Sequence, residues 1–304
     1  MSVLLAMQGA LSQGVLWGVM ALGVYITYRI LDIADLTVDG SFATGGAVCA
    51  VCVVNGVDPI LALLLATIAG AVAGFVTGFL HTKCEIPAIL AGILTQIGLY
   101  SINLRIMGRS NTPLLKSETL FKNISEMTGL SSTWTALIIG IIVSVVIVAI
   151  LYWYFGTEIG SAIRATGNNE QMVRALGVNT SVTKILGLMI GNALISLSGA
   201  LVTQSQGYAD IKMGIGAIVI GLASIVIGEV IFGQKGNFAF RLTSIIVGSI
   251  IYRIIVAIVL QMGMNTDDLK LLTAILVAIA LSVPVLISKR NQVAMYKKLT
   301  GKEE

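Results

Sequence analysis

The feature that most constrains this chain is a series of long stretches that contain no Asp, Glu, Lys or Arg. Eight occur, at residues 1–28, 40–57, 59–80, 86–104, 127–157, 185–209, 213–228 and 271–288. A ninth, at 242–261, is interrupted by Arg253. Each is near the roughly 20 residues that cross a bilayer as an α-helix. The chain is therefore predicted to be an all-α polytopic membrane protein with about nine transmembrane helices.

The composition leaves little room for a soluble domain. Only 11% of the 304 residues are charged, whereas soluble domains carry about 25%. We predict spans at residues 8–31, 40–56, 60–80, 86–105, 133–155, 184–203, 212–231, 241–261 and 269–288. The loops between them are short, so residues 1–304 are expected to form a single transmembrane domain.

Several kinds of site are missing from the sequence. No segment matches G-x-x-x-x-G-K-[ST], so the chain has no P-loop for ATP. His81 is the only histidine, which excludes a metal centre built from several histidines. Cys49 and Cys52 are three residues apart on one expected helix. Buried apolar thiols are a simpler interpretation of this pair than a redox or metal site.

The distribution of Lys and Arg predicts the orientation, because short basic loops stay in the cytoplasm. With the N-terminus outside and the C-terminus inside, 12 of the 19 basic residues fall on the cytoplasmic side. They are Arg29, Lys83, Arg164, Arg174, Lys184, Lys235, Arg241, Lys289, Arg290, Lys297, Lys298 and Lys302. We therefore expect an outer N-terminus and a cytoplasmic C-terminus.

The two halves of the chain show a weak similarity. The first and sixth predicted spans are each followed by a short segment that begins with aspartate, Asp35 or Asp210, and then by a Gly-rich helix. In the predicted orientation the two copies are inverted, as in many transporters. The organisation would be a first half at about 1–132, a linking helix at 133–155, a cytoplasmic loop at 156–183, a second half at 184–288 and a cytoplasmic tail at 289–304.

Three aspartates, Asp32, Asp35 and Asp39, lie between the first two spans. Aspartate at membrane depth is costly and normally faces a cavity or a partner. Asp39 or Ser41 could cap the next helix, whose N-terminal amides would then suit an anionic group such as a substrate carboxylate. The alternative is a cytoplasmic turn in which the aspartates are solvated.

The loop at 156–183 is predicted to form two short amphipathic helices on the cytoplasmic side. Ile159, Ile163 and Ala165 would share one face of the first helix, and the second would begin at Glu170. Such a pair can dock a cytoplasmic partner. The alternative is an interfacial helix that rests on lipid.

The same loop contains Gly160, Ile163-Arg164-Ala165, Asn168-Asn169-Glu170 and Leu176-Gly177-Val178, and is followed by Ser198-Gly199-Ala200-Leu201. This run resembles the cytoplasmic coupling loop of ABC importer permeases of the branched-chain amino acid and ribose type. Asp35-Leu-Thr-Val-Asp-Gly-Ser-Phe is similar to one branch of these permeases, which transports tryptophan, tyrosine or related amino acids. The resemblance covers nearly the whole chain.

The resemblance implies a type II-like importer permease located in a bacterial plasma membrane. Such permeases are not enzymes. They pair as dimers, here expected to be homodimers, and bind separate cytoplasmic ATPases that hold ATP and Mg²⁺. An extracytoplasmic binding protein delivers the substrate. The chain itself would bind no cofactor, metal or nucleic acid, and membrane lipid would surround it.

The resemblance also implies site residues. The ATPase contact would fall on Gly160, Ile163, Arg164, Ala165, Gly167, Asn168, Asn169, Glu170 and Gly177. The substrate path is expected at Asp35, Thr37, Asp39, Ser41, Phe42, Gln96 and Asn103. An amino acid needs an acceptor for its ammonium group, such as Asp35 or Asp39, and a donor for its carboxylate, such as a helix N-terminus. Helix–helix hydrogen bonds would explain Gln96 and Asn103 equally well.

Two other functions account for parts of the sequence. An ion-coupled secondary transporter would also show inverted repeats and membrane aspartates, but it has no need of a coupling loop. An intramembrane enzyme is disfavoured, because one histidine and no paired aspartates on spanning helices leave few catalytic groups. Glu229 and Arg253 are expected to pair with other charges across the bundle.

Overall fold

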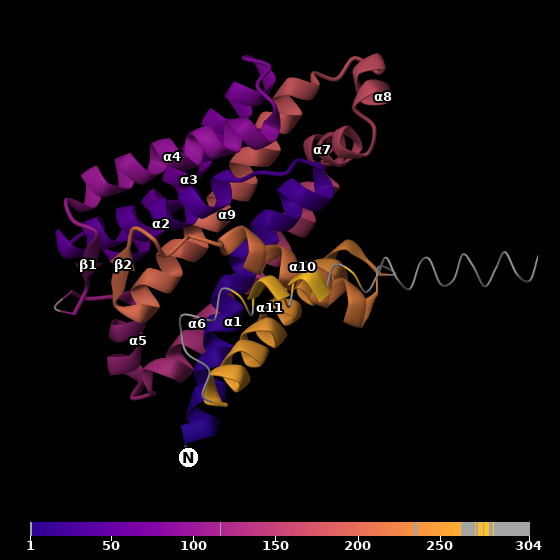
Figure 1. Ribbon diagram of the computed structural model, residues 1–304. Helices are drawn as coiled ribbons and strands as arrows, with labels where there is room; N and C mark the ends of the chain where they lie inside the picture. Colours follow the sequence, from indigo (N-terminus) through magenta and orange to yellow (C-terminus); the bar gives the residue numbers. More distant parts are fainter. Residues whose placement is uncertain are drawn as a thin grey trace, which may run out of the picture.

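The computed structural model describes residues 2–115, 117–233 and 236–262, together with 271, 273–275, 277–279 and 282. The described chain is mostly helical, and its long helices pack into one bundle (Figure 1). The elements in chain order are α1 (Ser2–Tyr25), a π-helix (Ile26–Ile30), α2 (Thr37–Val54), α3 (Pro59–Thr82), α4 (Ala88–Met107), β1 (Asn111–Pro113), α5 (Leu120–Thr128), α6 (Ser132–Gly156), α7 (Glu158–Asn168), α8 (Glu170–Ala175), α9 (Thr180–Gln206), β2 (Tyr208–Asp210), α10 (Ala217–Phe232) and α11 (Phe238–Gln261).

Seven helices in the described residues are long and apolar enough to cross a membrane. They are α1 with its π-helical extension, α2, α3, α4, α6, α9 and α11. These helices confirm seven of the predicted spans. The predicted span at 269–288 lies mostly outside the described residues, and the tail at 289–304 lies wholly outside them. A total of nine spans is therefore not confirmed.

The predicted span at 212–231 is wrong at its start, because α10 begins at Ala217. Residues 211–216 form turns, and Gly216 has a left-handed backbone with a φ of 88°. A left-handed residue interrupts a right-handed helix, and glycine adopts that conformation without a steric penalty. α10 is consequently a helix of 16 residues, shorter than the seven long spans.

The two halves of the bundle pack reciprocally. α1 packs along α11 and α9 packs along α3, so the first helix of each half contacts the third helix of the other. Glycine permits close approach at both contacts. A Cβ on Gly14 would lie 2.7 Å from the Ile250 Cα, and a Cβ on Gly74 would overlap the Leu188 carbonyl group. Small residues play this part in many membrane bundles.

The start of α2 differs from the predicted capping. The side chain of Asp35, two residues before the helix, accepts a hydrogen bond of 2.9 Å from the Thr37 amide. Neither Asp39 nor Ser41 caps α2, because both lie inside the helix and bond to other elements. The predicted helix break is nevertheless present, since a π-helix and an irregular segment separate α1 from α2.

The two ends of the bundle carry different connections (Figure 1). At one end β1 pairs antiparallel with β2, with Asn111 opposite Asp210, and α5 lies nearby. At the other end α7 and α8 connect α6 to α9, far from the N-terminus. The two short helices predicted for the loop at 156–183 are therefore present, at the opposite end from the N-terminus.

Candidate functional site

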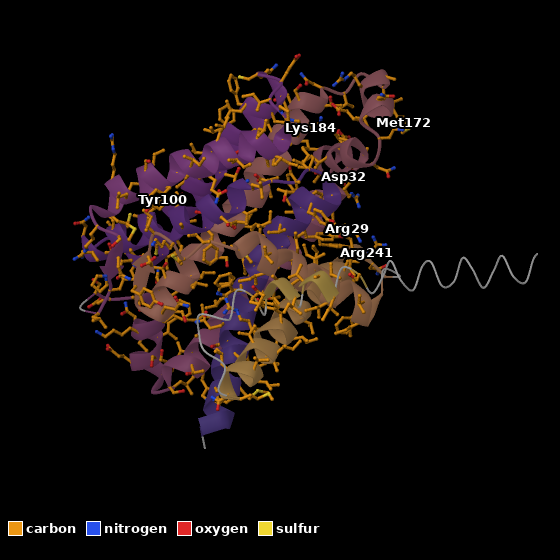
Figure 2. All side chains as sticks on the ribbon, viewed as in Figure 1. Arg29, Asp32, Tyr100, Met172, Lys184 and Arg241 are labelled. Atoms are coloured by element: carbon orange, nitrogen blue, oxygen red, sulfur yellow. The ribbon has the colours of Figure 1, made fainter. Side chains whose placement is uncertain are left out.

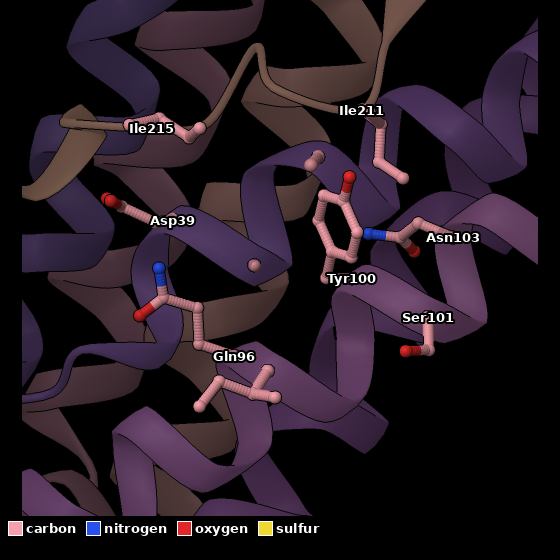
Figure 3. A pocket seen from close by; sticks show the side chains of 10 residues that line it. Asp39, Gln96, Tyr100, Ser101, Asn103, Ile211 and Ile215 are labelled. Atoms are coloured by element: carbon pink, nitrogen blue, oxygen red, sulfur yellow. The ribbon is translucent and has the colours of Figure 1, made fainter. Parts of the chain in front are cut away.

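A cavity of about 370 Å³ opens between α2, α4 and the segment before α10 (Figure 3). It is lined by Asp39, Gly40, Ala43, Gln96, Ile97, Tyr100, Ser101, Asn103, Ile211 and Ile215. Tyr100 and Ile97 are 46% and 63% exposed, so the cavity opens along the outer face of α4. The lining joins one carboxylate and two amides to apolar and aromatic side chains, the mixture expected of a small-molecule site.

The polar residues of α4 reach the cavity through helical spacing. Gln96, Tyr100 and Asn103 stand at i, i+4 and i+7 and therefore share one face. At Gly40 a Cβ would lie 3.2 Å from the Gln96 Cα, so the glycine brings this face of α4 against α2. Tyr100 was not among the predicted path residues, although this spacing is visible in the sequence. The other lining residues that were not predicted are Ile97, Ser101, Ile211 and Ile215, and the last two reach the cavity through the tertiary fold.

Asp39 connects α2 to the start of α10. Its Oδ2 accepts a hydrogen bond of 2.9 Å from the Gly216 amide, and its Oδ1 accepts one of 3.1 Å from the Ile218 amide. These amides belong to the first turn of α10, where a carboxylate also interacts favourably with the helix dipole. The anion-binding helix N-terminus was predicted on α2, whereas the amides that Asp39 meets belong to α10, and its carboxylate occupies them.

Asn103 is the most unusual group in the cavity. The residue is only 1% exposed, yet neither its Oδ1 nor its Nδ2 has a hydrogen-bond partner in the described part of the chain. An unpaired buried polar group costs about 1–3 kcal/mol. Figure 3 shows the Asn103 amide nitrogen directed toward Tyr100 and the interior of the cavity. The site therefore offers an unused donor and an unused acceptor.

The structure does not bring the other predicted path residues to this cavity. Asp35, Thr37, Ser41 and Phe42 are all buried among other helices. Asn192 of α9 donates to Asp35 at 2.7 Å and accepts from Ser41 at 2.6 Å, while the Phe42 ring lies 4.7 Å from that of Trp17. Burial raises the pKa of the Asp35 carboxyl. These four residues therefore do not line this cavity, because they face α9, α1 and α3. Their place on the substrate path stays a prediction.

The residues of the predicted ATPase contact fall into an inner set, packed against the bundle, and an outer set, exposed on the surface of the loop. Gly160 and Gly167 lie against backbone of α6 and of the α1 extension, and Ile163 is fully buried. The outer set is exposed and consists of Arg164, Asn168, Asn169 and Gly177. Ile159 is 53% exposed, so the predicted shared face of Ile159 and Ile163 is wrong. Ala165 is only partly buried.

Glu170 joins α8 to the start of α9. Its carboxylate accepts hydrogen bonds from Lys184 at 2.7 Å, from Arg174 at 2.8 Å and from Thr180 at 3.1 Å. The hydrogen bond from Lys184 is the main reason that the pKa of Glu170 lies below its usual value. Glu170 therefore holds α8 against the start of α9. It is one of the residues predicted to contact the ATPase.

Charged residues gather at the same end of the bundle as α7 and α8. Figure 2 shows Arg29, Asp32 and Arg241 there, and they line a cavity of about 480 Å³ that also includes Arg164. Arg29 donates to both carboxylate oxygens of Glu229 at 2.9 and 2.6 Å, which confirms the expected pairing of Glu229. Arg253 instead stacks on the Trp17 ring at 4.1 Å and meets no carboxylate among the described residues. Its expected charge pairing is not seen there.

Comparison with known proteins decides the family. The model of the branched-chain amino acid transport system permease component matches residues 6–282. This chain belongs to that permease family. The family confirms the resemblance drawn from the sequence, and the chain is a multi-pass, non-catalytic permease component of an ABC-type transporter.

The permease has relatives that match it over nearly its full length. A protein named tyrosine transport system permease protein, from Clostridioides difficile, is 41% identical over 97% of each chain. An uncharacterized protein of Rickettsia prowazekii is 36% identical over 90% of this chain and 95% of its own. A solved chain of a metal-chelate type ABC transporter has a TM-score of 0.49 and 14% identity, covering 92% of this chain and 84% of its own. At this TM-score and identity, no structural detail is transferred from that chain to this permease.

Proposed function

We propose that this permease is the membrane subunit of an ATP-driven importer for an aromatic amino acid such as tyrosine. The observation that carries the proposal is the cavity between α2 and α4, where a carboxylate and two amides meet apolar and aromatic side chains. The name of the Clostridioides difficile relative supports tyrosine as the kind of substrate.

In this proposal Asp39 accepts the ammonium group of the substrate. A carboxylate has about four acceptor positions, and the α10 amides use two of them. In Figure 3 the side-chain nitrogen of Gln96 points toward Asp39, where the amino acid end of the substrate is held. This nitrogen donates to the substrate carboxylate. Ile97, Tyr100 and Ile215 surround the aromatic ring, where ring–ring contact and burial favour binding.

A second copy of the permease covers the open side of the cavity along α4. The substrate then passes between two subunits, and the exposed Tyr100 and Ile97 become buried. The N-terminus, β1, β2 and α5 face outside, where a binding protein delivers the substrate. Lipid covers exposed apolar side chains such as Val145 of α6 and Ile68 of α3, as in a bacterial plasma membrane.

A separate ATPase, which holds ATP and Mg²⁺, docks on the outer side of α7 and α8. Arg164, Asn168 and Asn169 supply polar contacts there, and Met172 and Leu176 add apolar side chains that are 56% and 72% exposed. The inner side, at Gly160 and Ile163, transmits movement of the ATPases to α6 and α1. Transmission of this kind requires rigid contacts, and the packed glycines provide them.

Proteoliposomes test the proposal against the ion-coupled alternative. The permease reconstituted with its ATPase and binding protein is expected to accumulate labelled tyrosine only when ATP is supplied. The permease alone, with a proton or sodium gradient, is expected to accumulate none. Uptake by the permease alone, or no ATP-dependent uptake of any aromatic amino acid, would contradict the proposed function.

A further inference from the structure

We infer that Asn103 recognises a hydroxyl group at the tip of the substrate's aromatic ring, so that the transporter prefers tyrosine to phenylalanine. The inference rests on the proposed function, since it assigns one selective residue within the proposed substrate cavity. It concerns the ring end of the substrate, whereas Asp39 and Gln96 concern the amino acid end.

The first argument is the state of the Asn103 side chain. A comparable buried amide, Asn192, has three partners: it donates to Asp35 and to the Leu188 carbonyl, and it accepts from Ser41. Asn103 is buried as deeply but has none among the described residues. Since an unpaired buried amide is destabilising, its presence in a cavity wall points to a partner that enters the cavity.

The second argument is the position of Asn103 relative to Asp39. Figure 3 shows Asp39 beside Gln96 at one side of the cavity and Asn103 at the other, with the Tyr100 ring between them. Gln96 and Asn103 are seven residues apart on α4, which corresponds to about 10 Å along the helix axis. A substrate held at Asp39 by its ammonium group therefore extends its ring past Tyr100 toward Asn103.

The third argument is chemical complementarity. A phenol hydroxyl can donate one hydrogen bond and accept others, and an asparagine amide offers both an acceptor and a donor. Tyrosine thus satisfies Asn103, whereas phenylalanine leaves it unpaired. A site that contains a buried polar group discriminates against an analogue that lacks the matching hydroxyl.

The test compares uptake of labelled tyrosine and phenylalanine by the full complex in proteoliposomes, with saturating binding protein. The substitution is Asn103→Leu, and the matched control is Thr95→Val. Thr95 is buried on the same helix, its hydroxyl bonds to the Ala91 carbonyl, and it does not line the cavity. Because both permeases receive substrate from the same binding protein, its own selectivity cancels in the comparison.

Asn103→Leu is expected to lower the tyrosine-to-phenylalanine uptake ratio about fivefold, the factor that one neutral hydrogen bond contributes. Thr95→Val is expected to leave the ratio unchanged. The free Asn103→Leu permease should also melt at a higher temperature, because an unpaired amide has been removed, whereas a structural role for Asn103 predicts a lower melting temperature.

An unchanged ratio, with both amino acids still taken up, would overturn the inference and leave the proposed function standing. If the wild-type complex takes up neither amino acid, the proposed function fails and the inference falls with it. If Asn103→Leu does not assemble, or melts at a lower temperature, then Asn103 is structural and the inference is wrong.

Discussion

At the scale of single residues, Asp39 combines a structural contact with a proposed binding contact. Its carboxylate accepts from two amides of α10 and also lines the cavity. Asparagine has a single acceptor oxygen in its side chain and carries no charge, so it can replace only one of these two hydrogen bonds. The two roles of Asp39 can therefore be separated by substitution.

The capping role predicts a difference between two substitutions. Asp39→Ala should lower the free energy of unfolding of the purified permease by about 1 kcal/mol, the usual cost of a lost cap. Asp39→Asn should lower it by less, because the amide oxygen still accepts from one α10 amide, although the amide nitrogen is a donor and cannot replace the second acceptor. Denaturant unfolding in detergent measures both values. Equal losses for the two variants would contradict the capping role.

At the scale of elements, the joint between α8 and α9 depends on an ionised Glu170. Lys184 lowers the pKa of this carboxyl in the folded protein. The stabilisation is therefore present above the unfolded pKa and is lost as the pH falls through the lower folded pKa. Glu170→Gln should melt at a lower temperature than the wild type at neutral pH, and the difference should shrink on acidification.

Melting curves between pH 7 and pH 3 check this expectation. Glu158→Gln is the matched control, because Glu158 is an exposed carboxylate on α7 that forms no ion pair with any residue that the structure describes. A difference between the wild type and Glu170→Gln that does not depend on pH would show that the ion pair is not the stabilising contact.

The outer side of α8 gives a second prediction at this scale. Leu176 follows the last residue of α8, and Leu176→Asp places a charge on a side chain that is 72% exposed and proposed to contact the ATPase. It should weaken ATPase binding at least tenfold while the permease stays folded, since a desolvated interface tolerates an unpaired charge poorly. Met127→Asp, at an 86% exposed position on α5, is the control and should bind normally. Normal binding by Leu176→Asp would remove α8 from the docking surface.

The elements themselves were largely predictable from the sequence, because uncharged stretches report directly on membrane spans. The start of α10 was not, since Gly216 interrupts the helix within an apolar segment. Of the predicted path residues, Asp39, Gln96 and Asn103 line one cavity. Ser41 and Phe42 do not, because only the packing of α2 against α9 and α1 decides which face of α2 is free.

At the scale of the whole molecule, the proposed substrate cavity and the proposed ATPase docking surface lie in different parts of the permease. Reciprocal packing of α1 on α11 and of α9 on α3 joins the two halves into one frame. The cavity lies on one side of that frame, between α2 and α4, and α7 and α8 lie at one end. In the proposed function, the ATPase moves α7 and α8, and this movement drives passage of the substrate at the cavity. Transport therefore depends on both sites.

The most direct test of this account is the concentration dependence of ATP-driven tyrosine uptake by proteoliposomes that contain the complete transporter with Asp39→Asn. This substitution keeps one of the two side-chain hydrogen bonds to α10 and removes the charge that is proposed to hold the substrate ammonium group. The account predicts that the tyrosine concentration for half-maximal uptake rises about tenfold, as for loss of a charged hydrogen bond, while complex assembly and ATP hydrolysis without substrate are unchanged. An unchanged half-maximal concentration in a correctly assembled complex would contradict it.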